Sequence, residues 1–213
     1  MPSPFDFRKL PTNIFGLKWQ PTIEPDLSDD ADAHWQKVAK VFAASKEVTE
    51  SNRLVIRYEM IRLGGCHCIV EIGVCRSGKD SFTHVLLNDK PDGCVYLGVD
   101  LQDKSSLDDP DKNVHTIKVD SKERQLIFSK MQDLGHKEID LLLIDGWHSV
   151  NMAINDWQYI ERLSPHGVVV LHDTNFHPGP SLLFDAVDEE LFDKRKHCRW
   201  SWDHGIAVFR RKQ

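Results

Sequence analysis

The sequence lacks several features that would assign it at once to a broad class. No apolar run reaches the roughly 18 residues that a membrane-spanning helix needs, so we expect no membrane partner. Positive charge is not in excess, because 27 Lys and Arg stand against 33 Asp and Glu, a formal net charge of -6. Nucleic-acid binding normally requires a basic surface, so we expect no nucleic-acid partner. The opening residues MPSPFDFRKLPTN contain no apolar secretory segment, so export is not expected.

Cysteines are few and odd in number, which argues against a disulfide framework. The five stand mostly in segments that we predict to be strands, and they are Cys66, Cys68, Cys75, Cys94 and Cys198. Cys66 and Cys68 flank His67, but no second Cys/His pair stands at the spacing of a zinc site. We therefore predict reduced, buried thiols with a structural role, which is typical of a cytoplasmic protein.

Length and composition fit one domain with a short extension. The chain has 213 residues, of which 40% are hydrophobic, enough for a single α/β core. Residues 1–30 are rich in Pro and Asp and show no periodicity, which predicts an extended N-terminal arm. We expect this arm either to lie over the site or to pack on a second subunit in a homodimer. Residues 31–213 are predicted to form the folded domain.

Short apolar runs alternate with helical patterns along that domain. Strands are predicted at Cys68–Gly73, Val95–Asp100, His115–Asp120, Ile139–Asp145 and Gly167–Asp173. Helices are predicted from near Ala31, and at Ser51–Leu63, Ser77–Asn88, Lys122–Leu134, Val150–Leu163 and Ser181–Phe192. Strands such as Leu141–Ile144 are apolar throughout, as strands covered on both faces are. Two final runs, Arg199–Asp203 and Gly205–Arg210, predict an antiparallel hairpin.

The predicted fold class is therefore α/β. We expect a doubly wound, mostly parallel, seven-stranded Rossmann-like sheet with N-terminal helices and a C-terminal antiparallel hairpin. In such a sheet ligands bind at the carboxyl ends of the strands.

A glycine-containing turn follows the first predicted strand, and three kinds of ligand compete for it. A dinucleotide site is disfavoured, because Cys75 stands where G-x-G-x-x-G requires its middle glycine. A P-loop nucleotide hydrolase matches from Gly73 through Lys79, but Asp80 replaces the Ser or Thr that ligates magnesium. A carboxylate at that position adds like charge beside phosphates. A turn that binds no ligand also stays open.

S-adenosylmethionine fits the turn better than either nucleotide. Its methionine end needs a tight turn with exposed backbone donors, which Gly73 and Gly78 would shape. Its ribose needs an acidic acceptor, and Asp100 stands at the end of the second predicted strand. Asp120 ends the third strand, where it would face the adenine amino group. Each Asp alone is more often a helix cap, but their recurrence at strand ends favours a cofactor site.

The motifs at five successive strand ends resemble those of class I S-adenosylmethionine-dependent methyltransferases. They are Val70–Gly73, Gly78, Gly98–Asp100, Ile144–His148 and Pro165–Thr174. The chain is similar to a bacterial group related to the catechol and macrocin O-methyltransferases, over about Gly64 to Arg210. The resemblance implies methyl transfer from S-adenosylmethionine to a hydroxyl of a small molecule such as a sugar or phenol. It also implies that Glu71 helps to hold the ammonium group of the cofactor.

Two carboxylates are predicted at the same edge of the sheet, where they would serve catalysis. Asp145 ends the fourth strand, beside the cofactor, and Asp173 ends the fifth. Two such oxygen ligands suit Mg²⁺ or another divalent cation, which would lower the pKa of the acceptor hydroxyl. The resembling family commonly has Asn or Asp as a third ligand after the second carboxylate, whereas this chain has the weaker ligand Thr174. His148 stands where the resemblance places a catalytic base, and imidazole exchanges protons near neutral pH.

Alternatives to these assignments stay open. His148 is either a base or metal ligand, or a histidine bonded to a carboxylate at a helix start. His172 and His177 flank Asp173 and are substitute bases, although a regular strand would point His172 away from Asp173 and into the interior. A P-loop-like nucleotide hydrolase is the rival enzyme. The rival without catalysis is a methyltransferase-shaped binding protein, which the Thr174 departure keeps open.

Overall fold

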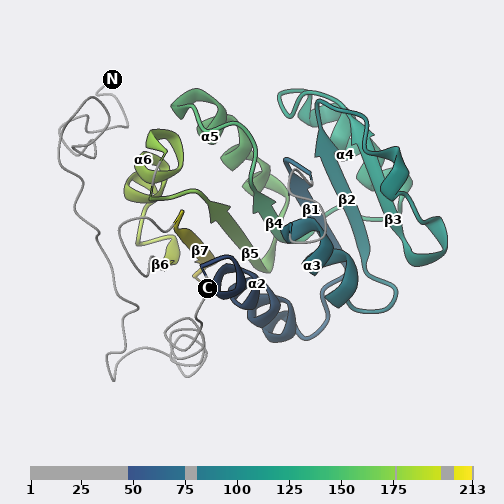
Figure 1. The fold of residues 1–213 in the computed structure, drawn as a ribbon, viewed down its shortest axis with the longest axis horizontal. Coiled ribbons are helices and arrows are strands. Elements are labelled where there is room, and N and C mark those ends of the chain that lie inside the picture. The colour runs from purple at the N-terminus through teal and green to yellow at the C-terminus, as the bar shows by residue number, and fades with distance from the viewer. Residues whose placement is uncertain (1–47, 75–80, 176, 198–203, 213) are drawn as a thin grey trace.

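The computed structural model describes residues 48–74, 81–175, 177–197 and 204–212, which form three layers (Figure 1). The middle layer is a seven-stranded sheet of order β3-β2-β1-β4-β5-β7-β6. Its strands are β1 (Cys68–Ile72), β2 (Val95–Asp100), β3 (Val114–Lys118), β4 (Ile139–Ile144), β5 (Leu163–His172), β6 (Phe192–His197) and β7 (Ile206–Arg211). Strands β1 to β5 are parallel, and β7 runs antiparallel to both β5 and β6. The predicted fold class is confirmed.

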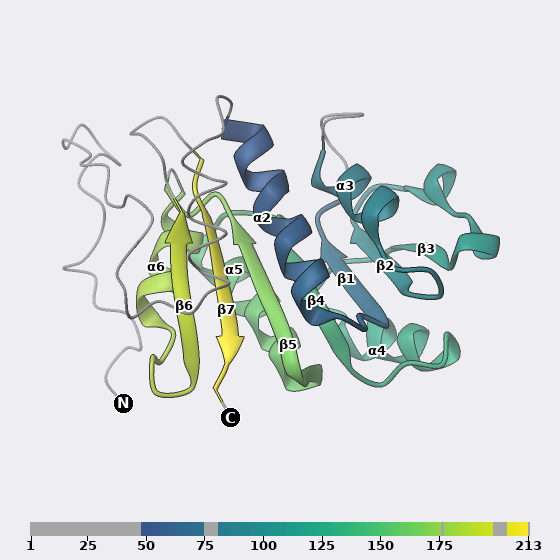
Figure 2. The ribbon, with the colours of Figure 1, turned by 90° about the horizontal axis from the view of Figure 1, so that it is seen from below.

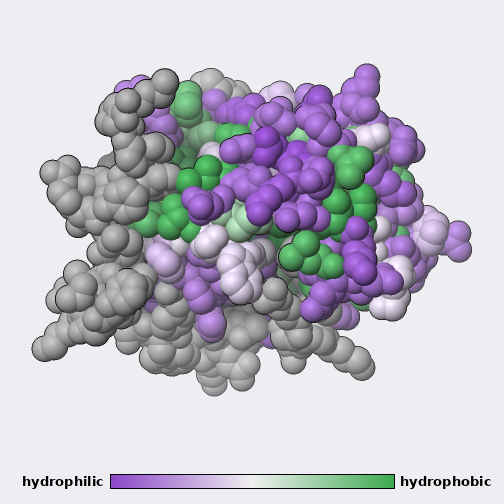
Figure 3. Space-filling view, turned by 90° about the horizontal axis from the view of Figure 1, so that it is seen from above, coloured by the Kyte–Doolittle hydropathy of each residue, from purple (hydrophilic) through white to green (hydrophobic). Residues whose placement is uncertain are grey.

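Helices cover both faces of this sheet. One face carries α2 (Val48–Leu63) and α3 (Phe82–Asp89), and the other carries α4 (Arg124–Asp133), α5 (Val150–Trp157) and α6 (Pro178–Ala186) (Figures 1 and 2). Short 3-10 turns lie at Ser105–Leu107, Pro110–Lys112 and Gln158–Arg162. Seen from the side of α4 to α6, the surface is mainly hydrophilic (Figure 3). Both faces of the sheet are therefore buried beneath helices.

The apolar strands are explained by two separate cores. Side chains alternate across a strand, so successive residues enter different layers. Leu141 and Leu143 of β4 pack with the core beneath α2 and α3, whereas Leu142 and Ile144 pack with the core beneath α4 to α6. A strand with both faces covered in this way has no polar side, as expected from the sequence.

The sixth strand differs from its predicted position. The predicted run Arg199–Asp203 lies outside the described residues, and the strand that pairs with β7 is Phe192–His197. The predicted helix Ser181–Phe192 ends earlier than expected, at Ala186, so Phe192 belongs to the strand. The sequence of this edge strand, FDKRKH, is mostly charged, which is how natural edges avoid further pairing. Because most of these residues are charged, the apolar pattern that predicts a strand is absent from this segment.

Some predictions fall outside the described residues. They are the N-terminal arm (1–30), the helix expected from Ala31, and Gly78 with the rest of the turn at 75–80. Within the described part of the chain, no helix is both long enough and apolar enough to cross a membrane.

Candidate functional site

The turn after β1 lies close against the end of β4 at Gly73. This residue has a φ of +88°, and a Cβ added to it would lie 2.2 Å from the carbonyl oxygen of Asp145. The Gly73 N–H donates to the Val99 carbonyl at 2.9 Å, and the Asp145 N–H donates to the Ile72 carbonyl at 2.8 Å. Only glycine lets the turn after β1 pass against the end of β4 with this backbone conformation.

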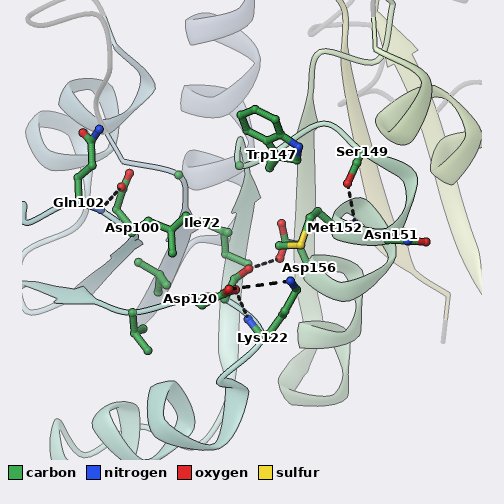
Figure 4. A pocket seen from close by; sticks show the side chains of 16 residues that line it. Ile72, Asp100, Gln102, Asp120, Lys122, Trp147, Ser149, Asn151, Met152 and Asp156 are labelled. Carbon is green, nitrogen blue, oxygen red and sulfur yellow. Dashed lines mark hydrogen bonds and ion pairs between the residues drawn. The ribbon is translucent and has the colours of Figure 1, made fainter.

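A cavity of about 660 Å³ lies beside the contact between Gly73 and the end of β4. Among the predicted residues, Gly73, Asp100 and Asp120 line it. Figure 4 shows Asp100 on one side of the cavity, with Trp147 and Met152 coming from the segment after β4. The structure therefore brings together three residues predicted to hold a cofactor, in a space that suits a nucleoside-sized ligand.

Asp100 links the turns that border the cavity. Its Oδ2 accepts a hydrogen bond from the Val74 N–H at 2.9 Å, and its Oδ1 accepts one from the Gln102 N–H at 2.7 Å. A carboxylate oxygen has two lone pairs, so each oxygen can accept a further hydrogen bond from a ligand hydroxyl. Asp120 is similarly placed, since its Oδ1 accepts the Lys122 N–H at 3.0 Å.

The wall opposite Asp100 includes residues that we did not predict as cofactor contacts. Trp147 is 67% exposed and presents an aromatic surface to the cavity. Asp156 is buried, and its Oδ1 accepts a hydrogen bond from the Ser121 hydroxyl at 2.6 Å. Burial raises the pKa of Asp156 to about 6, against the opposing hydrogen bonds of Ser121 and Asn155. Asp156 belongs to α5, so its hydrogen bond with Ser121 holds the turn after β3 against this helix.

Glu71 does not line this cavity. Its carboxyl group is fully buried, where it accepts hydrogen bonds from the Thr83 hydroxyl at 2.9 Å and from the Tyr96 hydroxyl. Burial raises the pKa of Glu71 to about 8, although both hydroxyls oppose that shift. The group is thus mostly protonated at neutral pH, and its role beside the cofactor ammonium stays a prediction.

The raised pKa of Glu71 predicts a pH-dependent stability. Between its unfolded value of 4.5 and its folded value of about 8, the folded protein binds more protons than the unfolded chain. Stability contributed by Glu71 therefore falls as the pH rises through this window. We expect the stability of Glu71→Gln relative to wild type to increase by roughly 1–2 kcal/mol between pH 6 and 8. Urea unfolding at several pH values measures this difference.

The exposed residue Glu190 provides the control for that measurement. Glu190→Gln should change the free energy of unfolding by the same small amount at every pH. A difference for Glu71→Gln that is constant from pH 6 to 8 would show that Glu71 is already ionised in the folded protein.

A cluster of imidazoles and carboxylates lies where β4 and β5 end. Asp173 Oδ2 lies 2.7 Å from His148 Nε2 and 3.3 Å from His172 Nδ1, and Asp173 Oδ1 lies 2.7 Å from His204 Nδ1. The other carboxylate, Asp145, has its Oδ1 3.0 Å from His172 Nδ1. Three histidines thus contact one buried carboxylate, and Asp145 contacts one of those histidines.

Residues of the cluster strongly shift the pKa values of Asp173 and His172. Burial alone would raise the pKa of Asp173, but hydrogen bonds from His148, His172 and His204 hold it well below its usual range. Burial alone would lower the pKa of His172, but Asp145 and Asp173 outweigh it and raise the value to about 10. Without a bound cation, His172 is therefore mostly charged at neutral pH, and it contacts both Asp145 and Asp173.

His172 packs internally, as expected, but it does not point away from Asp173, because the strand is not regular at its end. Strand β5 ends at His172, and Asp173 adopts a φ of +58°, in the left-handed region. Strand alternation therefore stops between these two residues, and both side chains enter the cluster. His177 also joins it, because its ring stacks on His148 with centroids 4.0 Å apart.

His204 is a cluster residue that sequence reasoning missed. It precedes β7, whose antiparallel pairing with β5 brings it next to the end of β5. Its carbonyl accepts a hydrogen bond from the Asn175 N–H at 2.9 Å. The only local signal was its position between the two runs predicted to form the hairpin, because the contact with Asp173 spans 31 residues of sequence.

Thr174 does not take part in any of these ion pairs. It is fully buried, and its hydroxyl lies where a Cβ on Gly205 would meet it at 2.8 Å. Its backbone N–H donates to the Gly205 carbonyl at 3.3 Å. Its role as a third metal ligand stays a prediction.

The family of the chain follows from a comparison with protein-family models. Residues 70–174 match the model of a methyltransferase domain, a segment that contains Gly73, Asp100, Asp120, Asp145 and Asp173. The matched segment of the chain is a methyltransferase domain. No curated protein matches the chain at a significant level.

Solved structures share the methyltransferase fold at low sequence identity. MycE, a methyltransferase of the mycinamycin pathway solved with Mg, S-adenosylhomocysteine and mycinamycin VI, is 15% identical with a TM-score of 0.55. The alignment covers 79% of this chain but 55% of MycE, so this methyltransferase spans little more than half the length of MycE. An O-methyltransferase from Bacillus cereus, solved with S-adenosylhomocysteine, is 15% identical over 88% of this chain and 94% of its own, with a TM-score of 0.53. TomG, an O-methyltransferase from Streptomyces achromogenes involved in tomaymycin synthesis and solved with S-adenosylmethionine, is 13% identical over 86% of this chain and 91% of its own, with a TM-score of 0.52.

In this methyltransferase one short segment joins the cavity to the cluster. Asp145 and His148 contribute to the cluster, whereas Gly146, Trp147 and Ser149 line the cavity. The cavity and the cluster therefore share the segment from Asp145 to Ser149.

Proposed function

We propose that the protein transfers a methyl group from S-adenosylmethionine to a hydroxyl oxygen of a small molecule. The observation that supports this most is the segment from Asp145 to Ser149, because some of its residues line the cavity and others belong to the cluster. Such an arrangement places a cofactor on one side of the segment and proton-transfer groups on the other. Proximity of this kind is what methyl transfer between two bound molecules requires.

The cavity would hold the adenosine part of the cofactor. Asp100 would accept hydrogen bonds from the ribose hydroxyls, and the exposed ring of Trp147 would stack against the adenine. Asp120 would accept a hydrogen bond from the adenine amino group. The structures of the Bacillus cereus O-methyltransferase and of TomG, which contain S-adenosylhomocysteine and S-adenosylmethionine, support this assignment.

His148 would remove the hydroxyl proton of the acceptor. Asp173 contacts its Nε2, so the other ring nitrogen, Nδ1, would accept the proton as the oxygen attacks the methyl group. Asp173 would then stabilise the imidazolium that forms, as the acidic residue does in other carboxylate–histidine pairs. A divalent cation at Asp145 and Asp173, when bound, would polarise the acceptor oxygen.

A small molecule is the acceptor that we propose, in place of nucleic acid. The net charge of -6 disfavours binding to a phosphate backbone. The acidic side chains of the cavity, Asp100, Asp120 and Asp156, point to the same conclusion.

Titration calorimetry with S-adenosylhomocysteine tests the cofactor assignment. Wild-type protein should bind it, and Asp100→Ala should weaken binding by at least about tenfold, because the ribose loses its charged acceptor. Asp111→Ala, which removes an exposed carboxylate outside the cavity lining, is the matched control and should bind normally. The melting temperature of each variant shows that it is folded.

Two results would contradict the proposal. Binding of ATP without any binding of S-adenosylhomocysteine would favour the P-loop-like hydrolase. Binding of S-adenosylhomocysteine without methyl transfer to any member of a panel of phenols and sugars would favour a binding protein without catalysis.

A further inference from the structure

The donor atoms of the cluster differ from those of an ordinary magnesium site. Two groups of three donors are close enough to hold an ion, one made of His148, Asp173 and His177 and the other of Asp145, His172 and Asp173. Within each group the donor atoms lie within 4.8 Å of one another. Every group mixes imidazole nitrogen with carboxylate oxygen.

We propose that this cluster binds a divalent transition-metal ion, of the zinc, manganese and iron class, in preference to Mg²⁺. The ligands would be Asp145, His172 and Asp173, which leaves His148 free for its role as base. The inference refines the proposed function, because the ion would lie where that function places the acceptor, but it concerns metal selectivity and does not require methyl transfer.

The first support is the chemistry of the donors. Mg²⁺ prefers oxygen ligands and retains several waters, whereas imidazole suits zinc, iron and other transition metals. Here the facing oxygens of both carboxylates lie against imidazole nitrogens, at 3.0 Å for Asp145 Oδ1 and 3.3 Å for Asp173 Oδ2 from His172 Nδ1. An ion that uses both carboxylates therefore meets His172 as well.

The second support is that His172 is held in place. Its side chain is only 13% exposed, and its ring packs edge-on against Phe82 with centroids 4.6 Å apart. On its other side it stacks with His204 at 5.8 Å. Mg²⁺ would have to displace this packed ring to build an all-oxygen site, whereas a transition metal would bind it.

The third support is the spacing of the donors. Bonds of roughly 2.0–2.2 Å to a tetrahedral or octahedral ion place neighbouring ligands roughly 3–3.5 Å apart. The contacts of His172 with the two carboxylates are 3.0 and 3.3 Å, and His148 Nε2 lies slightly closer to Asp173 Oδ2, at 2.7 Å. Little movement would therefore be needed to accept an ion.

The surroundings also orient the proposed ligands. His204 Nδ1 lies 2.7 Å from Asp173 Oδ1, which leaves the opposite oxygen, Oδ2, for the ion. His148, whose ring stacks on His177, also contacts Asp173. Outer contacts of this kind keep metal ligands in the correct orientation.

The test is metal binding by the full chain without any cofactor. The protein is stripped with a chelator, and Zn²⁺, Mn²⁺ and Mg²⁺ are titrated separately by calorimetry, with the bound metal counted by mass spectrometry. We expect one Zn²⁺ or Mn²⁺ per chain, bound at least about 100-fold more tightly than Mg²⁺. His172→Gln should weaken Zn²⁺ and Mn²⁺ binding by at least about tenfold, whereas the control His166→Gln, an exposed histidine outside the cluster, should not.

Asp145→Asn provides a second variant in case His172→Gln fails to fold, and it should weaken Zn²⁺ and Mn²⁺ binding in the same way. Equal affinity for Mg²⁺ and Zn²⁺ in the wild type would overturn the proposal. So would tight Zn²⁺ binding that survives in both variants, because the ion would then be held elsewhere, for example by cysteines. Calorimetry with S-adenosylhomocysteine in the presence of chelator is independent of these results, so failure of the metal site and failure of the cofactor site are distinguishable.

Discussion

His148→Ala is expected to lower the turnover number of methyl transfer by about 10²- to 10⁴-fold, the usual contribution of a general base. The affinity for S-adenosylhomocysteine should change by less than about threefold, because His148 does not line the cavity. The loss should be smaller at high pH, where more of the acceptor hydroxyl is already ionised. The rate of S-adenosylhomocysteine formation with an acceptor found in the phenol and sugar panel measures the effect.

His166→Ala is the control for this experiment, because His166 is exposed and far along β5 from the cluster. It should retain wild-type turnover. If His148→Ala also retains it, the proton leaves by another route and His177, which stacks on His148, becomes the next residue to replace.

Gly73→Ala is expected to destabilise the protein by about 3–5 kcal/mol, through overpacking and backbone strain together. The added Cβ would lie 2.2 Å from the Asp145 carbonyl oxygen and 2.9 Å from the Gly146 Cα, both of them backbone atoms. Relief would require β1 and β4 to separate at the edge of the cavity. The remaining folded protein should therefore also lose affinity for S-adenosylhomocysteine.

Gly93→Ala separates the contribution of backbone strain to the loss of stability from that of overpacking. Gly93 has a similar φ of +79°, but a Cβ added there meets no atom within 4 Å. This variant should cost only about 1–2 kcal/mol, the strain of a left-handed conformation. Urea unfolding compares the two variants. Equal destabilisation would mean that the backbone at Gly73 does not approach the end of β4 as closely as the structure shows.

The fold was predictable because each strand carries its own signal. The continuous apolar run of Leu141–Ile144 indicated burial on both faces, and the two cores beneath opposite layers of helices explain it. Gly73, Asp100 and Asp120 could be predicted as neighbours for the same reason. In a parallel sheet the carboxyl ends of adjacent strands meet at one edge, so position along each strand was sufficient.

The cluster was less predictable, because it depends on conformation and on distant pairing. His172 faces Asp173 only because Asp173 leaves the strand with a positive φ, which no pattern of apolar residues reveals. His204 arrives through the antiparallel return of β7, and β6 itself was hidden by its charged sequence. Asp156 was missed because a carboxylate in a helix is usually solvated, and its burial near the end of α5 depends on the turn at Ser121.

A crystal structure with S-adenosylhomocysteine tests the central claim most directly. We predict that the ribose hydroxyls will contact Asp100, that the adenine will lie beside Trp147, and that the sulfur will face the side of the segment that carries Asp145 and His148. A nucleoside bound outside the cavity, or a sulfur atom that points away from His148, would contradict the account.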